Sequence, residues 1–264
     1  MNGIAILGAG NIGVAIARGL TRSQRCEPEQ LILTRRHPRE IEGFSVQIEN
    51  RDAVRRAETV VVAVQPQQLD ELLSEIRDDL DPERHVVLSV VSGASCASIL
   101  ERVGKNVPVA RAMPNVAVAI GRSMTCLATG SDAALARARA VFDAVGTTVV
   151  IDEEQMIPAT ALCACGVAFF LRAVRAASQG GIEIGFHPED ALAMAAQTAA
   201  GAAALMLEMG RHPEREIDTV TTPRGCTIVG LNELEHRGFS SAMIKGILVA
   251  AEKAATLYKA RTDM

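Results

Sequence analysis

The chain has 264 residues, of which 48% are hydrophobic and 22% are charged, and it carries a net charge of −4 at pH 7. This balance is typical of a soluble globular protein and excludes a disordered chain. An acidic chain without a basic stripe among aromatic side chains gives no reason to expect nucleic acid as a partner. Uninterrupted apolar runs fall short of the roughly 18 residues of a membrane span, so we expect no membrane and a cytoplasmic location.

Short β-branched runs alternate with helical patterns in the first half of the chain. Strands are predicted at residues 4–7, 31–34, 60–64, 86–90, 107–111, 123–128 and 147–151. The segments between the early strands have the 3.6-residue period of amphipathic helices. Fully apolar strands that alternate with helices predict a parallel sheet with helices on both faces, which is a doubly wound α/β architecture.

The second half of the chain carries no strand pattern. Residues 153–209 are mostly helix formers, and the glycines of GGIEIGFHPED break them into two helices. Pro188 then lies just inside the start of the second helix, a position that proline favours. A last helix is predicted at about 240–262.

These patterns divide the chain into an α/β domain at residues 1–152 and an all-helical domain at residues 153–264. The apolar faces of the helical half, built from Ala, Leu and Met, are broader than one small domain requires. A homo-oligomeric interface would use this excess, although a wide apolar face also serves as an ordinary core.

The first predicted strand runs into a glycine-rich turn that opens a helix, GAGNIG at residues 8–13. In this motif the first glycine permits a tight turn, the second lets a pyrophosphate approach the backbone, and the third lets the helix pack against the strand. The phosphates would meet free N–H groups at the positive end of the helix. This context favours a dinucleotide site over a turn without a ligand. The predicted contacts are Gly8, Gly10, Asn11, Ile12 and Gly13.

The end of the second predicted strand distinguishes between the two nicotinamide dinucleotides. An NAD site needs an Asp or Glu here for the ribose 2′-hydroxyl, and none follows until Glu40. The residues present are Thr34, Arg35 and Arg36, and guanidinium groups bind phosphate in a bidentate manner. A solvated basic loop is the alternative. Together with the missing acid, the two arginines favour NADP(H) over NAD(H).

Six cysteines are spread along the chain. An even number says little about disulfides in a chain without a secretory signal. Cys163 and Cys165 do not have the spacing of a zinc site and have no neighbouring His, so we expect no metal. The expected role of the cysteines is to fill space as small side chains in a reducing compartment.

Four stretches carry a more specific signal: ILGAGNIG at residues 6–13, AVQP at 63–66, RAMPN at 111–115 and TVTTPRGCTIVGLNELEHRGF at 219–239. Together they resemble the pyrroline-5-carboxylate reductase family, over nearly the whole chain. The resemblance implies a Rossmann NADP(H)-binding domain followed by a helical substrate and dimerisation domain. It also implies NAD(P)H-dependent reduction of 1-pyrroline-5-carboxylate to L-proline, by a homodimer or a larger assembly of dimers.

The last of these stretches offers the groups that a cyclic imine carboxylate needs. Hydride transfer to a protonated C=N bond depends more on positioning and on a carboxylate anchor than on a strong acid. A threonine-rich turn at a helix start supplies N–H donors, hydroxyls and a favourable dipole for that anchor. On the residues alone, an ordinary N-cap is an equal alternative. The resemblance implies Thr222 and Thr227 as catalytic residues, with Thr227 near the imine nitrogen, and substrate contacts at Thr222, Arg224, Gly225, Cys226 and Thr227.

The resemblance also implies cofactor contacts beyond the glycine-rich turn. Asn50 would lie on the adenosine side, and AVQP would end a strand beside the cofactor. RAMPN would line the nicotinamide, since ligands of open α/β sheets bind at the carboxyl edge. An uninvolved loop is an open alternative for Asn50 and AVQP. The implied contacts are Thr34, Arg35, Arg36, Asn50, Ala63, Val64, Gln65, Pro66, Ala112, Met113, Pro114 and Asn115.

Three segments depart from the family pattern. Arg224 stands in a turn that usually reads Ser-Pro-Gly-Gly, and Gln65 stands where a Lys is usual. The segment Cys165–Phe169 lacks the Pro and the Tyr of the family's Gly-Ser-Gly-Pro-Ala-Tyr run. These departures leave the fold prediction intact and bear on the natural substrate.

Two alternative functions follow from these departures. One is a paralogous reductase that acts on a different cyclic imine carboxylate, such as one with a six-membered ring. The other is a non-catalytic NADP(H)-binding protein, which the retained threonines of the turn make the weaker alternative. The β-hydroxyacid dehydrogenases share the domain order but use a Lys as acid and base, and this chain has no Lys between Lys105 and Lys245.

Overall fold

The computed structural model describes residues 3–37 and 40–258. Two compact units divide the chain. Unit 1 takes the residues up to Cys165 together with those from Val249 onwards, and unit 2 takes Gly166–Leu248. Each unit is described by itself below.

The predicted boundary at residue 152 lies where the sheet ends, whereas unit 1 continues as far as Cys165. The additional residues pack on the sheet, because Met156 and Ala159 share a buried cluster with Met113, the last residue of the strand Val109–Met113. The compact units and the two expected domains therefore differ by the short helical segment that leaves the sheet and by the C-terminal residues.

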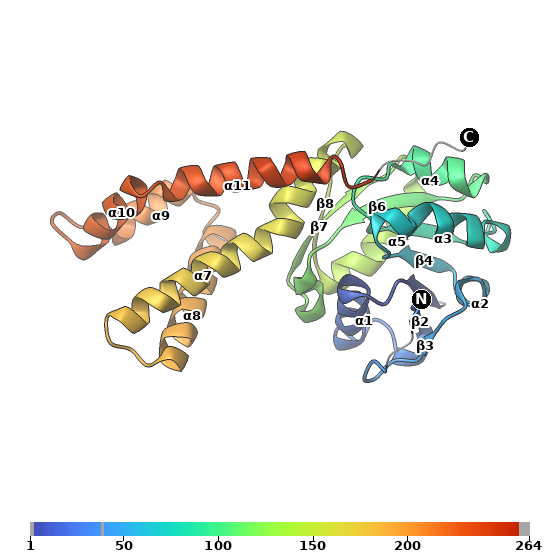
Figure 1. The fold of residues 1–264 in the computed structure, drawn as a ribbon, viewed down its shortest axis with the longest axis horizontal. Coiled ribbons are helices and arrows are strands. Elements are labelled where there is room, and N and C mark those ends of the chain that lie inside the picture. The colour runs from blue at the N-terminus through green and yellow to red at the C-terminus, as the bar shows by residue number, and fades with distance from the viewer. Residues whose placement is uncertain (1–2, 38–39, 259–264) are drawn as a thin grey trace. The chain divides into compact units, whose positions relative to one another are not determined.

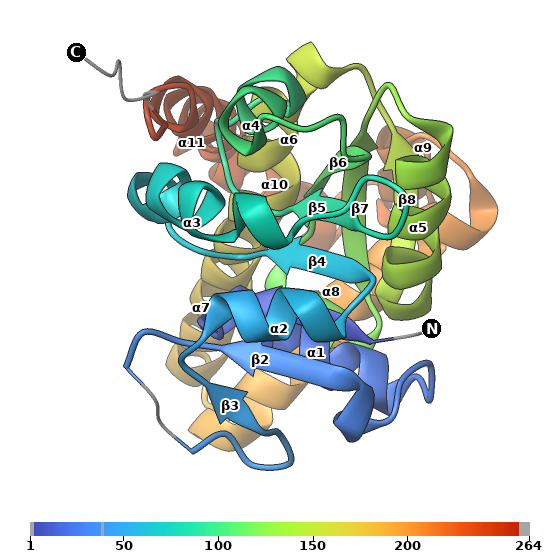
Figure 2. The ribbon, with the colours of Figure 1, turned by 90° about the vertical axis from the view of Figure 1, so that its right-hand side faces the viewer.

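A mainly parallel sheet forms the centre of unit 1 (Figures 1 and 2). Its strand order is β3-β2-β1-β4-β5-β6-β7-β8. The strands are β1 Ile4–Leu7, β2 Leu31–Thr34, β3 Val46–Gln47, β4 Thr59–Val62, β5 Val86–Ser89, β6 Val109–Met113, β7 Ser123–Ala128 and β8 Gly146–Val150. Every strand predicted from the sequence is present. The additional strand is β3, whose two residues are too few to show an alternation.

One strand departs from the expected parallel arrangement. β7 runs antiparallel to β6, with Cys126 opposite Met113, while every other neighbouring pair in the described sheet is parallel. Only residues 114–122 connect β6 to β7, and a parallel crossover needs about a dozen residues or more. The short connection therefore makes β7 turn back along its neighbour.

Helices cover both faces of the sheet. In unit 1 they are α1 Asn11–Arg22, α2 Asn50–Arg56, α3 Leu69–Ile76, α4 Cys96–Val103, α5 Asp132–Phe142 and α6 Met156–Ala159, and a π-helical segment follows at Thr160–Cys165. Successive strand residues point to opposite sides of a sheet. Ile4 and Ile6 accordingly share a core with α1 and α5, and Ala5 and Leu7 share one with α2, α3 and α4. β1 is buried on both faces, as a doubly wound fold requires.

Unit 2 is helical, as the sequence predicts. Its helices are α7 Gly166–Glu183, α8 Pro188–Met209, α9 Pro213–Val220, α10 Cys226–His236 and α11 Phe239–Ala254, of which the last residues belong to unit 1. Pro188 occupies the first position of α8, after the break that the glycines predict. α11 ends at Ala254, earlier than the expected 262, and residues beyond 258 lie outside the described part of the chain.

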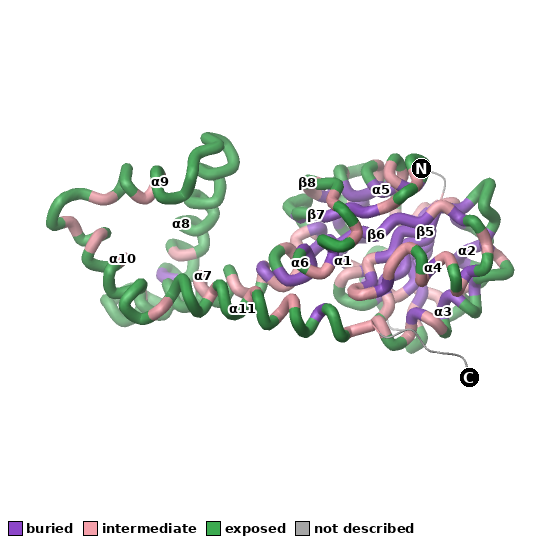
Figure 3. Tube along the Cα trace, turned by 90° about the horizontal axis from the view of Figure 1, so that it is seen from above, coloured by how far each residue is buried: buried purple, intermediate pink, exposed green. Residues whose placement is uncertain are grey.

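Unit 2 has almost no buried core of its own. Its buried residues are Gly166, Ser178 and Ala191, whereas Phe170 is 64% exposed and Leu207 is 83% exposed. Figure 3 shows this contrast as purple along the strands of unit 1 and green along α8, α9 and α10. By length and composition alone, α8 and the helical stretch that contains α7 are also apolar enough to cross a membrane. Exposed apolar faces of this kind require a partner surface.

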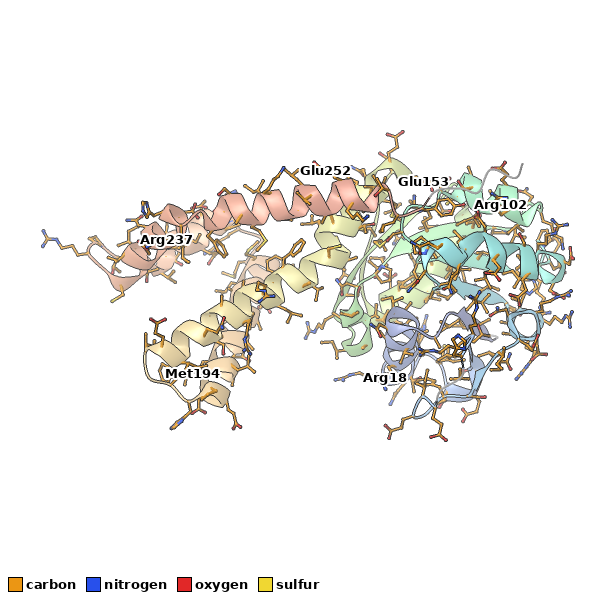
Figure 4. All side chains as sticks on the ribbon, in the orientation of Figure 1. Arg18, Arg102, Glu153, Met194, Arg237 and Glu252 are labelled. Atoms are coloured by element: carbon orange, nitrogen blue, oxygen red, sulfur yellow. The ribbon has the colours of Figure 1, made fainter. Side chains whose placement is uncertain are left out.

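The residues after α11 pack on unit 1. The Tyr258 hydroxyl donates a 2.8 Å hydrogen bond to Asp70 of α3, and Arg102 of α4, labelled in Figure 4, lies 3.4 Å from the same carboxylate. The tyrosine lies against Gly93, where an added Cβ would be 2.8 Å from the Tyr258 Cβ. Burial and the bond to Asp70 raise the pKa of Tyr258 to about 12. The C-terminal residues therefore complete the packing of the α/β unit.

We expect Tyr258→Phe to lower the free energy of unfolding by about 1 kcal/mol, because the variant keeps the ring on Gly93 and loses one hydrogen bond. Urea denaturation followed by circular dichroism measures the change. Tyr258→Ala, which also removes the ring, should be the more destabilising of the two. Equal stability of wild type and both variants would contradict a structural role for this contact.

Candidate functional site

The glycine-rich turn leads from β1 into α1. Gly8 has a φ of +107°, a region that favours glycine, and an added Cβ would lie 2.6 Å from the Ala63 carbonyl oxygen. At Gly13 an added Cβ would overlap the Gly8 carbonyl oxygen. The turn therefore requires glycine at Gly8 for its conformation and at Gly13 for the close packing of helix on strand.

The start of α1 is open. Gly10 is its N-cap residue, no side chain caps the helix, and no acidic residue lies in its first turn, which begins with Asn11 and Ile12. The first N–H groups of a helix have no acceptor within the helix. A Cβ added to Gly10 would meet no atom within 4 Å. Free donors beside open space fit an anionic phosphate.

A cleft of about 510 Å³ lies in front of this turn. It opens at the carboxyl ends of β1 and β4, where the strand order reverses, and ligands of open α/β sheets bind at such a reversal. The cleft brings together predicted cofactor contacts that are far apart in the sequence: Gly8, Gly10, Thr34, Arg35, Arg36, Asn50, Ala63, Val64 and Gln65. Pro66 starts the short 3-10 turn that follows them.

A hydrogen-bond network holds one wall of the cleft. Thr34 Oγ1 donates to Asn50 Oδ1 at 2.5 Å, and Asn50 Nδ2 donates to Glu75 at 2.9 Å. The Thr34 carbonyl accepts the backbone N–H groups of Gly8 at 3.2 Å and Ala9 at 2.7 Å. The Thr34 hydroxyl is therefore engaged within the wall, and its carbonyl ties the end of β2 to the glycine-rich turn.

The two arginines at the end of β2 take different partners. Arg35 Nη1 donates to the Ala9 carbonyl at 3.1 Å, which places its guanidinium beside the turn. Arg36 Nη2 lies 2.9 Å from Glu71 Oε2, in an ion pair whose two side chains are both exposed. The sequence predicts two cations here, and the structure shows that one of them already has a carboxylate partner.

Sequence analysis missed a further part of the cleft wall, which Gln68, Glu71 and Glu75 contribute. Glu71 and Glu75 are four residues apart, which places them on one face of α3, and Gln68 lies directly before that helix. That spacing is the signal that identifies them. Glu71 pairs with Arg36, and Glu75 and Glu49 also line the cleft, so the cleft has mixed charge rather than the basic character that Arg35 and Arg36 alone imply.

The RAMPN segment ends β6 and turns at Asn115. The Asn115 N–H donates to Ser123 Oγ at 3.1 Å, its Oδ1 accepts the Ala117 N–H at 3.0 Å, and its Nδ2 donates to the Cys163 carbonyl at 3.1 Å. These bonds fix the turn. The walls of the 510 Å³ cleft do not include residues 112–115, and the next residue, Val116, lines a neighbouring cleft of about 410 Å³. A nicotinamide contact at RAMPN stays a prediction.

An ion pair made by the first residue of RAMPN, the buried Arg111, is a second feature that sequence analysis missed. Arg111 Nη1 lies 3.2 Å from Glu153 Oε1, and Glu153, labelled in Figure 4, also accepts the Cys96 N–H at 2.7 Å. Nε and Nη2 of Arg111 are buried without a hydrogen-bond partner. Burial and the Glu153 carboxylate raise the pKa of the Cys96 thiol to about 11. This pair ties β6 to the start of α4 and to the helical stretch after β8.

The threonine-rich turn lies in unit 2, directly before α10. Gly225 is the N-cap residue, no side chain caps the helix, and no acidic residue lies in its first turn. The Gly225 N–H donates to the Thr222 carbonyl at 2.9 Å, while Thr222, Cys226 and Thr227 are exposed. A threonine N-cap, the alternative that the residues left open, is therefore absent, and the free end of α10 is available to an anion.

Arg224 is the unusual residue of this turn. Its φ is +61°, a left-handed conformation that is unfavourable for a residue with a Cβ atom. The residue is exposed. The departure from the Gly of the family's Ser-Pro-Gly-Gly pattern thus falls on a backbone position that suits glycine.

Two family models match this chain. The model described as pyrroline-5-carboxylate reductase dimerisation matches residues 153–257. The model described as NADP oxidoreductase, coenzyme F420-dependent, matches residues 3–93. The two models thus fall on the helical half and on the first half of the sheet.

Among proteins of similar sequence, pyrroline-5-carboxylate reductase 1 of Dictyostelium discoideum is 53% identical over 97% of this chain, which spans only 50% of that protein's length. Pyrroline-5-carboxylate reductase 2 of the same organism is 44% identical over 95% of this chain and 91% of its own length. The pyrroline-5-carboxylate reductase of Methanosarcina acetivorans is 31% identical over 97% and 98% of the two chains.

Solved structures of similar proteins have the same fold as this chain. A pyrroline-5-carboxylate reductase from Coxiella burnetii has a TM-score of 0.85 at 26% identity, with 98% of this chain and 99% of that chain covered. The Plasmodium falciparum pyrroline carboxylate reductase, solved with NADP bound, has a TM-score of 0.90 at 21% identity over 97% and 98% of the two chains. At that identity the second likeness shows the fold, which is the expected Rossmann domain followed by a helical dimerisation domain.

We expect Arg224→Gly to raise the free energy of unfolding by about 0.5–1 kcal/mol, because glycine adopts the left-handed conformation without strain. Thermal unfolding measures the change. Arg175→Gly, at an exposed arginine in the interior of α7, is the matched control and should destabilise by about 1 kcal/mol. A loss of stability in Arg224→Gly as large as that of the control would show that the arginine side chain itself stabilises the turn.

Proposed function

This chain belongs to the pyrroline-5-carboxylate reductase family, and we propose that it reduces 1-pyrroline-5-carboxylate to L-proline, with NADPH as the preferred hydride donor. It is an NAD(P)-dependent oxidoreductase that acts on a C=N bond. The observation that carries the proposal is the 44% identity to a reductase of this name over 95% of this chain and 91% of that protein. The proposal assigns cofactor binding to residues 1–152 and substrate binding and dimerisation to residues 153–264.

The residues present fit the cofactor. The open N-terminus of α1 and the bare Gly10 leave room and donors for a pyrophosphate. The cleft beyond it is lined by the arginines and by Asn50, the groups expected on the adenosine side. We therefore assign the pyrophosphate to residues 8–13, and the adenosine half to Thr34, Arg35, Arg36 and Asn50 with AVQP beside it. RAMPN is assigned to the nicotinamide.

The substrate carboxylate is assigned to the turn at residues 222–227. Free N–H groups at the start of α10 and the exposed hydroxyls of Thr222 and Thr227 are the donors that support this assignment. Arg224 adds a cation beside them. The helix dipole adds a further favourable interaction with an anion at this end.

The chemistry asks the chain mainly to position its ligands. When bound, the reduced nicotinamide supplies a hydride to the imine carbon of the substrate. The turn before α10 holds the carboxylate and so fixes which face of the ring is presented. Thr227 is assigned to the imine nitrogen, where its hydroxyl acts as a hydrogen-bond partner. A strong general acid is unnecessary, since a protonated imine is already electrophilic.

The direct test is NADPH oxidation by the purified protein, followed by loss of NADPH absorbance, with 1-pyrroline-5-carboxylate and its six-membered homologue in parallel. Faster turnover of the five-membered imine supports the proposal. Preference for the larger ring would point to a paralogous imine reductase, an alternative that Arg224, Gln65 and the Cys165–Phe169 segment motivate. Tight NADPH binding without turnover of either imine would leave a non-catalytic binding protein.

The mixed charge of the cleft should affect the preference between NADP⁺ and NAD⁺. Glu71 competes for Arg36 at 2.9 Å and would repel a 2′-phosphate. We expect Glu71→Gln to tighten NADP⁺ binding about two- to five-fold, the scale of one exposed charge interaction, and to leave NAD⁺ binding nearly unchanged. Isothermal titration calorimetry at low ionic strength measures both affinities.

Glu101→Gln is the matched control for this variant, because Glu101 is an exposed carboxylate of α4 and is absent from the cleft walls. It should leave the affinities for both cofactors unchanged. Equal changes for NADP⁺ and NAD⁺ in Glu71→Gln would argue against contact between Arg36 and a 2′-phosphate.

We assign the helical half the role of the subunit interface, in a homodimer or a larger assembly of dimers in the cytoplasm. Support comes from the dimerisation model over residues 153–257 and from an apolar groove of about 710 Å³ between α7 and α8, lined by Phe170, Met194 and a series of alanines. A second copy of the chain that covers this groove would also account for the membrane-like hydropathy of these helices.

We expect Phe170→Asp to convert the dimer to monomers, because a carboxylate in an apolar interface is desolvated without a partner. Size-exclusion chromatography with light scattering gives the mass. Ile120→Asp, at an exposed apolar residue of unit 1 that is 57% accessible, is the control and should remain dimeric. A Phe170→Asp protein that is folded and still dimeric would move the interface away from this groove.

A further inference from the structure

Two cysteines far apart in the sequence meet in unit 1. The sulfur atoms of Cys126 and Cys163 lie 3.7 Å apart, and both are free thiols. Cys126 belongs to β7 and is only 4% exposed, whereas Cys163 lies in the π-helical segment Thr160–Cys165 and is half-buried. Cys163 is therefore the less buried residue of the pair.

The pair is in contact with the RAMPN segment. Cys126 lies opposite Met113 in the β6–β7 pairing, and Cys163 packs against the cluster that contains Met113 and Met156. The Cys163 carbonyl accepts a 3.1 Å hydrogen bond from Asn115 Nδ2. A movement of Cys163 is thus transmitted to the side chain that fixes the turn after β6.

The two thiols differ in acidity. When Cys163 is the thiolate, the Cys126 S–H is the donor of the contact between the two sulfur atoms, and this hydrogen bond lowers the pKa of Cys163 against the opposing effect of burial. The same hydrogen bond, together with burial, raises the pKa of Cys126. We take Cys163 as the nucleophile of the pair, because it is the less buried residue and because the thiolate is the reactive form.

We propose that Cys126 and Cys163 form a reversible disulfide, with glutathione disulfide as the oxidant, and that its formation slows the reductase. The inference rests on the geometry of the pair next to RAMPN, and only its effect on turnover rests on the proposed function. Disulfides of cytosolic proteins are mostly transient or redox-sensing, which suits a pair of this kind.

The exchange proceeds in two steps. The Cys163 thiolate attacks one sulfur of glutathione disulfide, and a glutathione thiolate leaves. Cys126 then gives its proton to that thiolate and attacks the Cys163 sulfur, which releases the second glutathione thiolate to be protonated by solvent. One S–S bond breaks and one forms, so two protein thiols are oxidised and one glutathione disulfide is reduced to two thiols.

Closure of the disulfide requires a local movement. The sulfur atoms must approach from 3.7 Å to about 2.0 Å. Cys126 is held in a strand that is bonded on both sides, so the π-helical turn with Cys163 is the part that shifts. We expect this shift to strain the bond between Asn115 and the Cys163 carbonyl and so to displace the turn after β6.

Cys165 is the competing partner, and the helix geometry argues against it. Residues two apart in a helix do not face each other, so Cys163 and Cys165 point in different directions. Cys165→Ser is therefore the matched control. The Cys163→Ser variant removes the nucleophile. The Cys126→Ala variant removes the resolving thiol and leaves a small apolar side chain in its place.

The full-length protein is equilibrated in glutathione buffers of increasing disulfide content, and free thiols are then blocked by alkylation. Peptide mapping by mass spectrometry locates the cross-link, and turnover and NADP⁺ affinity are measured on the same samples. Wild type and Cys165→Ser should lose two thiols each, show a Cys126–Cys163 link, and lose turnover several-fold until dithiothreitol restores it. Cys163→Ser should keep its turnover in oxidising buffer.

Three outcomes would overturn the proposal. They are a link from Cys163 to Cys165 or to a second chain, an absence of any link in buffers that oxidise a reference vicinal dithiol, and a Cys126–Cys163 link with unchanged turnover. If Cys126→Ala does not fold, Cys163→Ser and the mapping decide the question by themselves. Because the mapping and the NADP⁺ affinity do not require turnover, failure of the disulfide is distinguishable from failure of the proposed function.

Discussion

The close contact between α1 and the turn after β1 is the constraint on which the candidate cofactor site depends. An added Cβ at Gly13 would overlap the Gly8 carbonyl oxygen, so the helix approaches the strand only because both positions are glycine. This approach aims the free N–H groups of α1 at the reversal of strand order between β1 and β4. The Thr34 carbonyl, which accepts two N–H groups of the turn, then places the end of β2 beside it. The cleft follows from these backbone contacts before any charged side chain is added.

The cleft contains side chains of both charge signs. Arg35 and Arg36 come from β2, and Glu71 and Glu75 come from the helix that follows β4. The ion pair between Arg36 and Glu71 is exposed at both ends, and exposed pairs contribute little to stability. In the proposed NADP(H) site the pair would matter for selectivity, because a 2′-phosphate would compete with Glu71 for the Arg36 guanidinium.

The fold and the residues on one side of the cleft are predictable from the sequence, because apolar runs and the glycine spacing are local signals. The antiparallel β7 depends on the length of a connection, and β3 is too short to carry a pattern. The contacts of Glu153 and Cys126 are harder to predict, since the partner of each residue lies far away in the sequence and comes close only in the folded chain. The same limit applies to the turn before α10, where the free helix end and the left-handed Arg224 are visible only in the backbone.

The C-terminal contact has a consequence for the order in which this chain folds. Tyr258 and the end of α11 pack on the α/β unit, although the whole of unit 2 precedes them in the sequence. The α/β unit is therefore discontinuous, and during synthesis it cannot complete its packing until the helices of unit 2 have left the ribosome. A fragment cut after the last strand would lack the residues that cover Gly93 and bond to Asp70. The helical unit is in effect an insertion within the nucleotide-binding unit.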